Sequence, residues 1–125
     1  MSPHISIVIP AYQEEGRVGR TVRTLRRALA ERPDLSWELT VVDDGSVDKT
    51  AFEAGREGAR VLRLPRNAGK GAALLAGFQE ATGSVLVMVD ADVVETADQA
   101  LLLLEPILGG RADMAVGAFQ RPPGL

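Results

Sequence analysis

Hydrophobic residues follow two patterns along this chain: short continuous runs, and longer stretches with an apolar residue at every third or fourth position. Short runs rich in β-branched residues are typical of strands, and the wider spacing is typical of amphipathic helices. The runs predict strands over residues 5–9, 37–42, 59–64, 85–89 and 112–119. The spaced stretches predict helices over residues 14–31, 47–57, 70–81 and 96–104.

Local signals add detail to the predicted helices. Ser46 precedes the second helix and is expected to cap it, because a serine oxygen accepts hydrogen bonds from the first free amides. Residues 96–99 read Thr-Ala-Asp-Gln, which fits a capping box for the fourth helix. In the third helix, the side chains expected to face the core are Leu74, Leu75 and Phe78.

The alternation of strands and helices predicts an α/β protein. Connections of about a dozen residues or more favour parallel strands joined by right-handed crossovers. The expected fold is a Rossmann-like three-layer α/β/α sandwich with a mainly parallel, doubly wound sheet. Its expected strand order is 59–64, 37–42, 5–9 and 85–89, and the last run is apolar enough for a central strand covered on both faces.

Composition limits the classes of protein that this chain can represent. Its 125 residues suit a single domain, and 46% hydrophobic and 25% charged residues are ordinary for a globular protein. The net charge of −3 does not favour binding to nucleic acid or to an anionic membrane, and the lack of cysteine excludes disulfides and thiolate metal sites. Without an apolar run of ~18 residues or room for a signal peptide, we expect a cytoplasmic protein, either fully soluble or peripheral to a membrane.

Two carboxylates follow the fourth predicted strand, in the segment Asp90-Ala91-Asp92. Open α/β sheets bind their ligands at the carboxyl ends of their strands. Mg²⁺ and Mn²⁺ prefer oxygen ligands, and Mg²⁺ often takes one or two carboxylates together with substrate phosphates. The pair predicts a metal site, although acidic residues also begin many ordinary loops after a strand.

Two further strand ends add to this site. Asp43 and Asp44 follow the second strand, and the first strand ends in Pro10-Ala11-Tyr12-Gln13-Glu14. In the expected strand order, these ends lie along one edge, so four aspartates converge and repel one another unless a cation or a donor-rich ligand is bound. The alternative is structural: Asp43-Asp44-Gly45-Ser46 as a turn with a helix cap, and Tyr12 as a packing residue.

Lys70 is flanked by Gly69 and Gly71 at the predicted start of the third helix, where backbone amides favour an anion. The alternative is a solvated lysine in a flexible loop. Dinucleotide-binding and P-loop fingerprints are absent, and the single histidine, His4, precedes the first strand, which disfavours a Ser-His-Asp triad. The residues themselves therefore indicate a diphosphate bridged by a metal.

Four segments together resemble the family 2 glycosyltransferases of GT-A fold, in order and spacing over nearly the whole chain. They are residues 7–15 (IVIPAYQEE), 41–50 (VVDDGSVDKT), 67–71 (NAGKG) and 89–92 (VDAD). The Gly-Lys-Gly sequence is closer to polyprenyl-phosphate glucosyltransferases and glucosyl-3-phosphoglycerate synthases than to dolichol-phosphate mannose synthases. The resemblance implies a UDP- or GDP-linked sugar donor, with Mg²⁺ or Mn²⁺ as cofactor.

The resemblance also implies roles for single residues. Asp90-Ala91-Asp92 corresponds to the DxD motif, with Asp92 as the more direct metal ligand and Asp90 shared between ribose and metal. Lys70 is expected near the base or the diphosphate. The residues expected around the base and ribose are Pro10, Ala11, Tyr12, Glu14, Asp43 and Asp44.

The acceptor implied by the resemblance is a polyprenyl phosphate or a small phosphorylated metabolite. Family members continue into an acceptor-binding half that supplies the catalytic base, so we expect residues 1–125 to be one nucleotide-sugar-binding domain without that base. After Asp92 the only acids fall on a predicted helix or strand: Glu95, Asp98, Glu105 and Asp113. Two alternatives stay open: a non-catalytic nucleotide-binding module, and a sugar nucleotidyltransferase. The second is disfavoured because the glycine- and arginine-containing loop of those enzymes is missing after the first strand.

Overall fold

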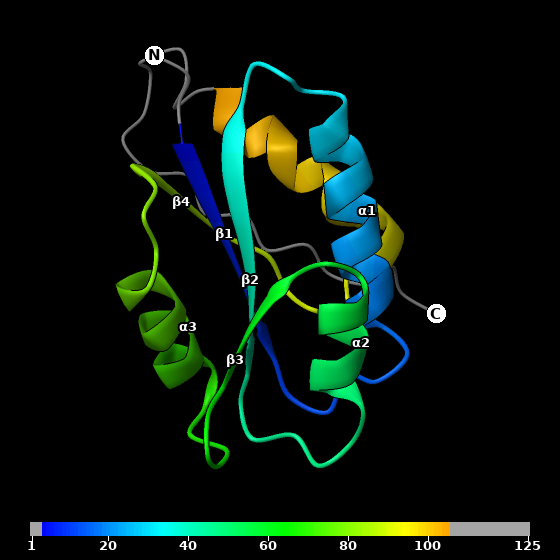
Figure 1. The fold of residues 1–125 in the computed structure, drawn as a ribbon, viewed down its shortest axis with the longest axis vertical. Coiled ribbons are helices and arrows are strands. Elements are labelled where there is room, and N and C mark those ends of the chain that lie inside the picture. Colours follow the sequence, from blue (N-terminus) through cyan, green and yellow to red (C-terminus); the bar gives the residue numbers. More distant parts are fainter. Residues whose placement is uncertain (1–3, 106–125) are drawn as a thin grey trace.

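A parallel sheet of four strands forms the centre of the computed structural model, which describes residues 4–105 (Figure 1). The strands are β1 (His4–Ala11), β2 (Ser36–Asp43), β3 (Arg60–Arg63) and β4 (Val85–Met88), in the order β3-β2-β1-β4. The helices are α1 (Val18–Ala30), α2 (Thr50–Arg56), α3 (Lys70–Gln79) and the 3₁₀ helix η1 (Val94–Leu103). The α/β class and the strand order are confirmed, and the strand predicted over 112–119 lies outside the described residues.

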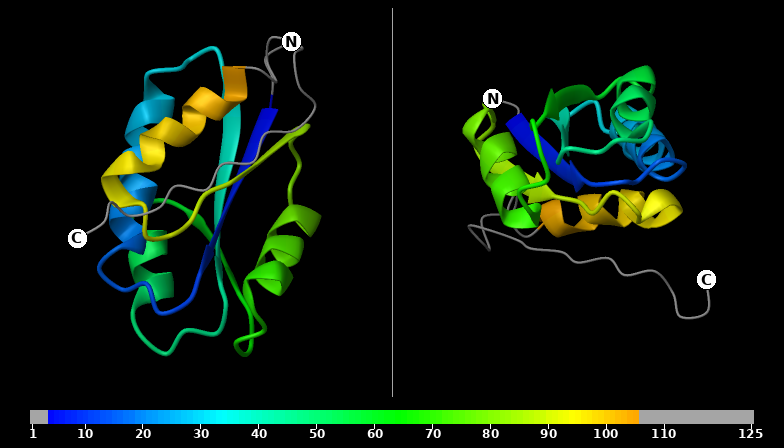
Figure 2. Two further views of the ribbon diagram at one scale, coloured as in Figure 1. Left: turned by 180° about the vertical axis from the view of Figure 1, so that it is seen from behind. Right: turned by 90° about the horizontal axis from the view of Figure 1, so that it is seen from below.

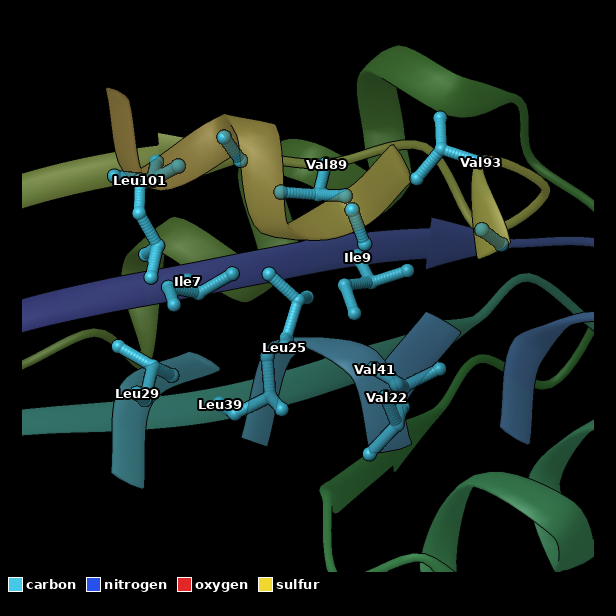
Figure 3. Close-up of a cluster of buried hydrophobic side chains, with 14 of the residues drawn as sticks. Ile7, Ile9, Val22, Leu25, Leu29, Leu39, Val41, Val89, Val93 and Leu101 are labelled. Atoms are coloured by element: carbon cyan, nitrogen blue, oxygen red, sulfur yellow. The ribbon is translucent and has the colours of Figure 1, made fainter. Parts of the chain in front are cut away.

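Helices cover both faces of the sheet, so the predicted three layers are present. Helices α1, α2 and η1 lie on one side of the sheet and α3 lies on the other (Figure 2). Strand alternation sends Ile7 and Ile9 towards α1, and Val8 towards α3. The larger core therefore lies between the sheet, α1 and η1. Figure 3 shows part of it, including Ile7, Ile9, Val22, Leu25, Leu29, Leu39, Val41 and Val89.

Helix α3 packs closely on the sheet through a glycine. A Cβ built on Gly77 would lie 2.5 Å from Cγ1 of Val8, so only a residue without a side chain fits this contact. This packing decides which face of α3 is buried. Leu74 and Phe78 are half-buried against the smaller core, as expected, but Leu75 is 59% exposed, so its predicted inward position is wrong.

The helices after β1 and β4 begin differently from prediction. The first was expected from residue 14 but begins at Val18, after a turn in which the Glu14 carbonyl accepts from the Val18 amide at 3.0 Å. The capping box at 96–99 is wrong, because η1 begins at Val94 and the Thr96 hydroxyl donates to the Val93 carbonyl at 2.8 Å. None of the helices described over residues 4–105 is long and apolar enough to cross a membrane.

The cap of α2 is also different. This helix begins at Thr50, and its amide donates to Asp48 Oδ1 at 3.0 Å. The predicted cap, Ser46, instead accepts through Oγ from the Gln13 amide of the neighbouring loop at 2.9 Å. The expected serine cap is therefore wrong: Lys49 is the N-cap residue and makes no side-chain cap hydrogen bond, and Asp48 accepts from the first amide of the helix.

Strand β4 is the end member of the described sheet, next to β1. Val87 is buried towards α1 and η1, whereas Leu86, on the opposite face, is 42% exposed. The prediction of a central strand covered on both faces is therefore wrong for the described residues. The carboxyl end of β4 lies beside the N-terminus of α3, and Asp90 and Asp92 follow it in the chain.

Candidate functional site

A cavity of about 420 Å³ lies at the carboxyl ends of the strands, beside the N-terminus of α3. All the predicted site residues line it except Ala11 and Asp43. Two lining residues that the sequence did not single out as site residues are Asn67 and Ala73, the latter one turn after Lys70 on α3. The full lining consists of Pro10, Tyr12, Glu14, Asp44, Asn67, Gly69, Lys70, Ala73, Asp90, Ala91 and Asp92.

Lys70 and Asp90 form an ion pair across the cavity. Lys70 is the first residue of α3, and its Nζ lies 2.6 Å from Asp90 Oδ1 beyond the end of β4. The ammonium is about half exposed and the carboxylate less so. The structure thus brings together the predicted cationic group and one of the two predicted metal ligands.

Asp44 holds the loop that leads into α3. Its buried carboxylate accepts from the amides of Ala68 at 2.8 Å and Gly69 at 2.9 Å, and from Asn67 Nδ2 at 3.0 Å. Gly45 supports the same contact, because a Cβ there would lie 2.5 Å from the Asn67 nitrogen. Asp44 therefore lines the cavity as predicted and also fixes the backbone before Lys70.

Asp43 and Ala11 lie beneath the cavity and do not line it. Asp43 is fully buried, and its Oδ1 accepts from the Ser46 amide at 3.0 Å. Its Oδ2 is 3.3 Å from Arg63 Nε, an ion-pair distance, but receives no well-aligned hydrogen bond from the described residues. The Ala11 carbonyl accepts from the Asp44 amide at 2.8 Å, so both residues support the wall above them.

The loops after β1 and β2 are joined by polar side chains that sequence reasoning assigned to capping or left unassigned. Three side chains at alternate positions after β2 accept from three consecutive amides after β1, and this regular spacing was the available signal. The hydrogen bonds are Gln13 N to Ser46 Oγ at 2.9 Å, Glu14 N to Thr50 Oγ1 at 2.9 Å and Glu15 N to Asp48 Oδ2 at 3.3 Å. They place Tyr12 and Glu14 at the edge of the cavity.

Thr21 of α1 holds the segment between the two aspartates, a role that no local sequence pattern predicts. Its buried hydroxyl donates to the Ala91 carbonyl at 2.6 Å and accepts from the Val94 amide at 3.0 Å. Val94 has a φ of 50°, which is unfavourable for a β-branched residue. One hydroxyl therefore secures the strained turn that carries Asp92.

Arg17 adds positive charge near the acidic wall. Its Nε donates to Glu14 Oε2 at 2.5 Å, and this hydrogen bond is the main cause that raises the pKa of Arg17 above its usual value. Partial burial acts in the opposite direction, and the charges of Glu14, Asp92 and Asp48 contribute further to the rise. The guanidinium therefore stays charged and offsets part of the carboxylate charge.

Asp90 and Asp92 fit a cation shared with a ligand rather than one held by the protein alone. Within residues 4–105, no group of three or more histidine, cysteine or acidic side chains is placed to hold a metal. Two carboxylates lining one cavity are nevertheless the donor set that Mg²⁺ uses when phosphates supply further ligands. The ammonium of Lys70 against Asp90 shows that this wall accommodates positive charge.

Curated relatives match most of this chain but only part of their own length. Dolichyl-phosphate beta-glucosyltransferase ALG5C of Trichomonas vaginalis is 38% identical over 105 residues, which cover 77% of this chain and 31% of the relative. Dodecaprenyl-phosphate galacturonate synthase of Rhizobium johnstonii is 34% identical over 122 residues, which cover 93% of this chain and 36% of the relative. The chain thus spans about a third of the length of these two proteins.

Solved structures share the fold. Glucosyl-3-phosphoglycerate synthase of Mycobacterium tuberculosis superposes with a TM-score of 0.74 at 28% identity, over 86% of this chain and 41% of that chain. Its complex with Mn²⁺, UDP and phosphoglyceric acid gives a TM-score of 0.74 at 30% identity, over 85% and 39%. The sequence model described as glycosyl transferase family 2 matches residues 6–124. This chain therefore belongs to glycosyl transferase family 2 and has the Rossmann-like fold of GT-A type.

Proposed function

We propose that this cavity binds the nucleotide-diphosphate part of a sugar donor, in a glycosyltransferase that moves a hexose to a phosphorylated acceptor. The observation that carries the proposal is the meeting of Lys70, Asp90 and Asp92 in one cavity beside a helix N-terminus. Because an ammonium and helix amides favour phosphates while the carboxylates favour a cation, the wall matches a diphosphate with its counterion. UDP is preferred to GDP in this proposal, because several solved structures of a relative are complexes with UDP.

The residues have separate tasks in the proposed reaction. Asp92 and Asp90 would hold a divalent cation, Mg²⁺ or Mn²⁺, which would neutralise negative charge on the departing nucleotide diphosphate. Lys70 binds a diphosphate oxygen, and Tyr12 stacks on the base. Pro10, Glu14 and Asp44 form the base and ribose walls, with Ala11 and Asp43 supporting them from beneath.

The proposed acceptor carries a phosphate, and the proposed catalytic base lies outside the described residues. The relatives are named for dolichyl-phosphate and dodecaprenyl-phosphate acceptors or bind phosphoglyceric acid, which supports a polyprenyl phosphate or a small phosphorylated metabolite here. The described acids after Asp92 do not line the cavity: Glu95 pairs with Arg20, Glu105 pairs with Arg32, and Asp98 lies exposed on η1. This favours a base from outside residues 4–105.

The same observation supports a second candidate function, in which the chain binds the nucleotide but transfers nothing by itself. Both candidates predict nucleotide binding, but only the first predicts transfer of the sugar. Incubation with UDP-[¹⁴C]glucose, Mn²⁺ and either a polyprenyl phosphate or phosphoglyceric acid separates them, because radiolabel reaches an acceptor only if the chain is catalytic. Binding without label transfer to either acceptor supports the second candidate.

Titration calorimetry with UDP and GDP, each with and without Mn²⁺, tests the binding proposal. We expect UDP binding that depends on Mn²⁺ and weakens at least about 10-fold in D92N, the scale typical of damage to a metal site. D98N is the matched control, because Asp98 is an exposed acid that does not line this cavity. UDP binding by the folded protein that is insensitive to both Mn²⁺ and D92N would contradict the proposal.

A further inference from the structure

The ion pair between Lys70 and Asp90 occupies one of the two carboxylates that the proposed function assigns to a divalent cation. We propose that Lys70 is the resident counterion of Asp90 in the protein without donor, and that it exchanges Asp90 for the diphosphate when the metal-bound donor enters. This inference rests on the proposed function and adds to it an order of events. Metal and nucleotide bind together because the metal replaces Lys70 as the partner of Asp90, and the diphosphate replaces Asp90 as the partner of Lys70.

The backbone at Lys70 is fixed, and its side chain is not. The Ala68 and Gly69 amides are bound to Asp44, and Gly69 has a φ of 101°, which favours glycine and sets the start of α3. Beyond this anchor, the Lys70 side chain is 54% exposed on a flexible four-carbon stem. Exchange therefore needs only a change of rotamer, with no movement of α3.

Charge balance explains why the exchange is coupled to the diphosphate. Glu14 is paired with Arg17, Asp44 accepts from three loop donors, and Asp90 is paired with Lys70. A cation that arrives alone competes with the ammonium for Asp90 and brings no new anion to the ammonium it displaces. A cation that arrives with a diphosphate offers the displaced ammonium a phosphate oxygen within the same cavity. The cation alone is therefore bound weakly and is bound more tightly with the diphosphate.

The chain offers a matched pair of variants, since its only two lysines are Lys49 and Lys70. Free Mn²⁺ is measured by electron paramagnetic resonance during titration of the 125-residue protein, and UDP binding is measured by calorimetry in the presence of Mg²⁺. We expect K70M to bind Mn²⁺ alone about two- to five-fold more tightly, which is the range for loss of a partly exposed ion pair. We expect the same variant to bind UDP with Mg²⁺ more weakly, while K49M changes neither value.

Nuclear magnetic resonance separates a true exchange from a general effect of charge. With lysine labelled at ¹³Cε, the chain gives two side-chain signals, and K49M assigns them. We expect D90N to move the Lys70 signal in the protein without ligand, and Mg²⁺ with UDP to move it again to a third position. Circular dichroism confirms that each variant is folded.

The outcomes separate this inference from the proposed function. Tighter Mn²⁺ binding and weaker UDP binding in K70M, with the three distinct Lys70 signals, support the exchange. Two results overturn the exchange and leave the proposed function intact, provided that wild-type protein binds Mn²⁺ and UDP. One is a Lys70 signal that does not shift in D90N, and the other is an Mn²⁺ affinity that is unchanged in K70M. Failure of folded wild-type protein to bind either ligand overturns both.

Discussion

Replacement of Thr21 by valine tests whether α1 positions the two aspartates. Valine has nearly the shape of threonine, so T21V keeps the packing of this buried position and removes only the hydroxyl. The Ala91 carbonyl and the Val94 amide, bound to that hydroxyl at 2.6 and 3.0 Å, then lose their partner in a buried environment. The variant therefore disturbs the aspartate segment without touching either carboxylate.

The size of the effect follows from the two groups left unpaired. A buried polar group without a partner costs about 1–3 kcal/mol, so the rigid response is a loss of roughly 2–6 kcal/mol in the free energy of unfolding. Val94, with its φ of 50°, already holds strain of order 1–3 kcal/mol, so the segment has reason to relax once released. Relaxation limits the expected loss to about 2–4 kcal/mol and moves Ala91 together with the neighbouring carboxylates.

Urea unfolding followed by circular dichroism measures the first effect, and calorimetry of Mn²⁺ and UDP measures the second. T21S is the control, because it keeps the hydroxyl and loses one methyl group, at a cost of about 1 kcal/mol. We expect T21S to bind the ligands as the wild type does and T21V to bind them more weakly. A T21V protein with the wild-type unfolding midpoint and wild-type affinities would refute the positioning role.

Three further predictions follow from single contacts. Asp44→Asn replaces one of two accepting carboxylate oxygens with an NH₂ group that cannot accept, so a loop amide bound there exchanges faster with deuterium and nucleotide binding weakens; unchanged exchange would contradict this. Gly77→Ala forces a methyl group against Val8, and overpacking of about 1–3 kcal/mol should outweigh the roughly 1 kcal/mol gain in helix propensity. A thermal midpoint of Gly77→Ala above that of the wild type would contradict this prediction. The Ser6 hydroxyl donates to the Glu38 carboxylate, and this hydrogen bond is the largest cause that lowers the pKa of Glu38. The stability that the ionised Glu38 contributes is therefore fully present above pH 4.5 and is lost as pH falls through the lowered pKa. Glu38→Gln should flatten this loss in urea titrations between about pH 5 and 3, and an unchanged slope would contradict it.

Strand alternation made the sheet predictable, and the same rule limited what could be predicted of its edges. Ile7 and Ile9 face one core while Val8 faces the other, so the run carries apolar side chains on both faces, as a central strand must. The run that forms β4 has the same composition, yet Leu86 is exposed. Periodicity reports that a residue is apolar, whereas coverage depends on where α3 lies, and Gly77 fixes that position through a close contact that no pattern reveals.

At the site, the motifs predicted which residues meet but not what each one holds. Asp43 is the last residue of β2, so it follows the alternation of Val41 and points away from the cavity that Asp44 lines. A strand one residue shorter would have freed it from this alternation, and strand ends are the least predictable part of a sequence pattern. The role of Thr21 could not be predicted for a different reason. Thr21 lies 70 residues before Ala91, and a single buried threonine on a helix carries no local signal of such a contact.

Charge in the cavity explains why a cation is central to the proposed function. The lining carries four carboxylates, from Glu14, Asp44, Asp90 and Asp92, and one ammonium from Lys70, while Arg17 at its edge adds a second positive charge. The positive charges are fewer than the carboxylates, so the cavity keeps a net negative charge that attracts a divalent cation. A nucleoside diphosphate without a cation would deepen this negative charge, since like charges at close range repel in a partly enclosed site. The acidic side chains repel a free diphosphate, so binding of the diphosphate requires the metal. In the proposed exchange, Lys70 moves from Asp90 to the diphosphate.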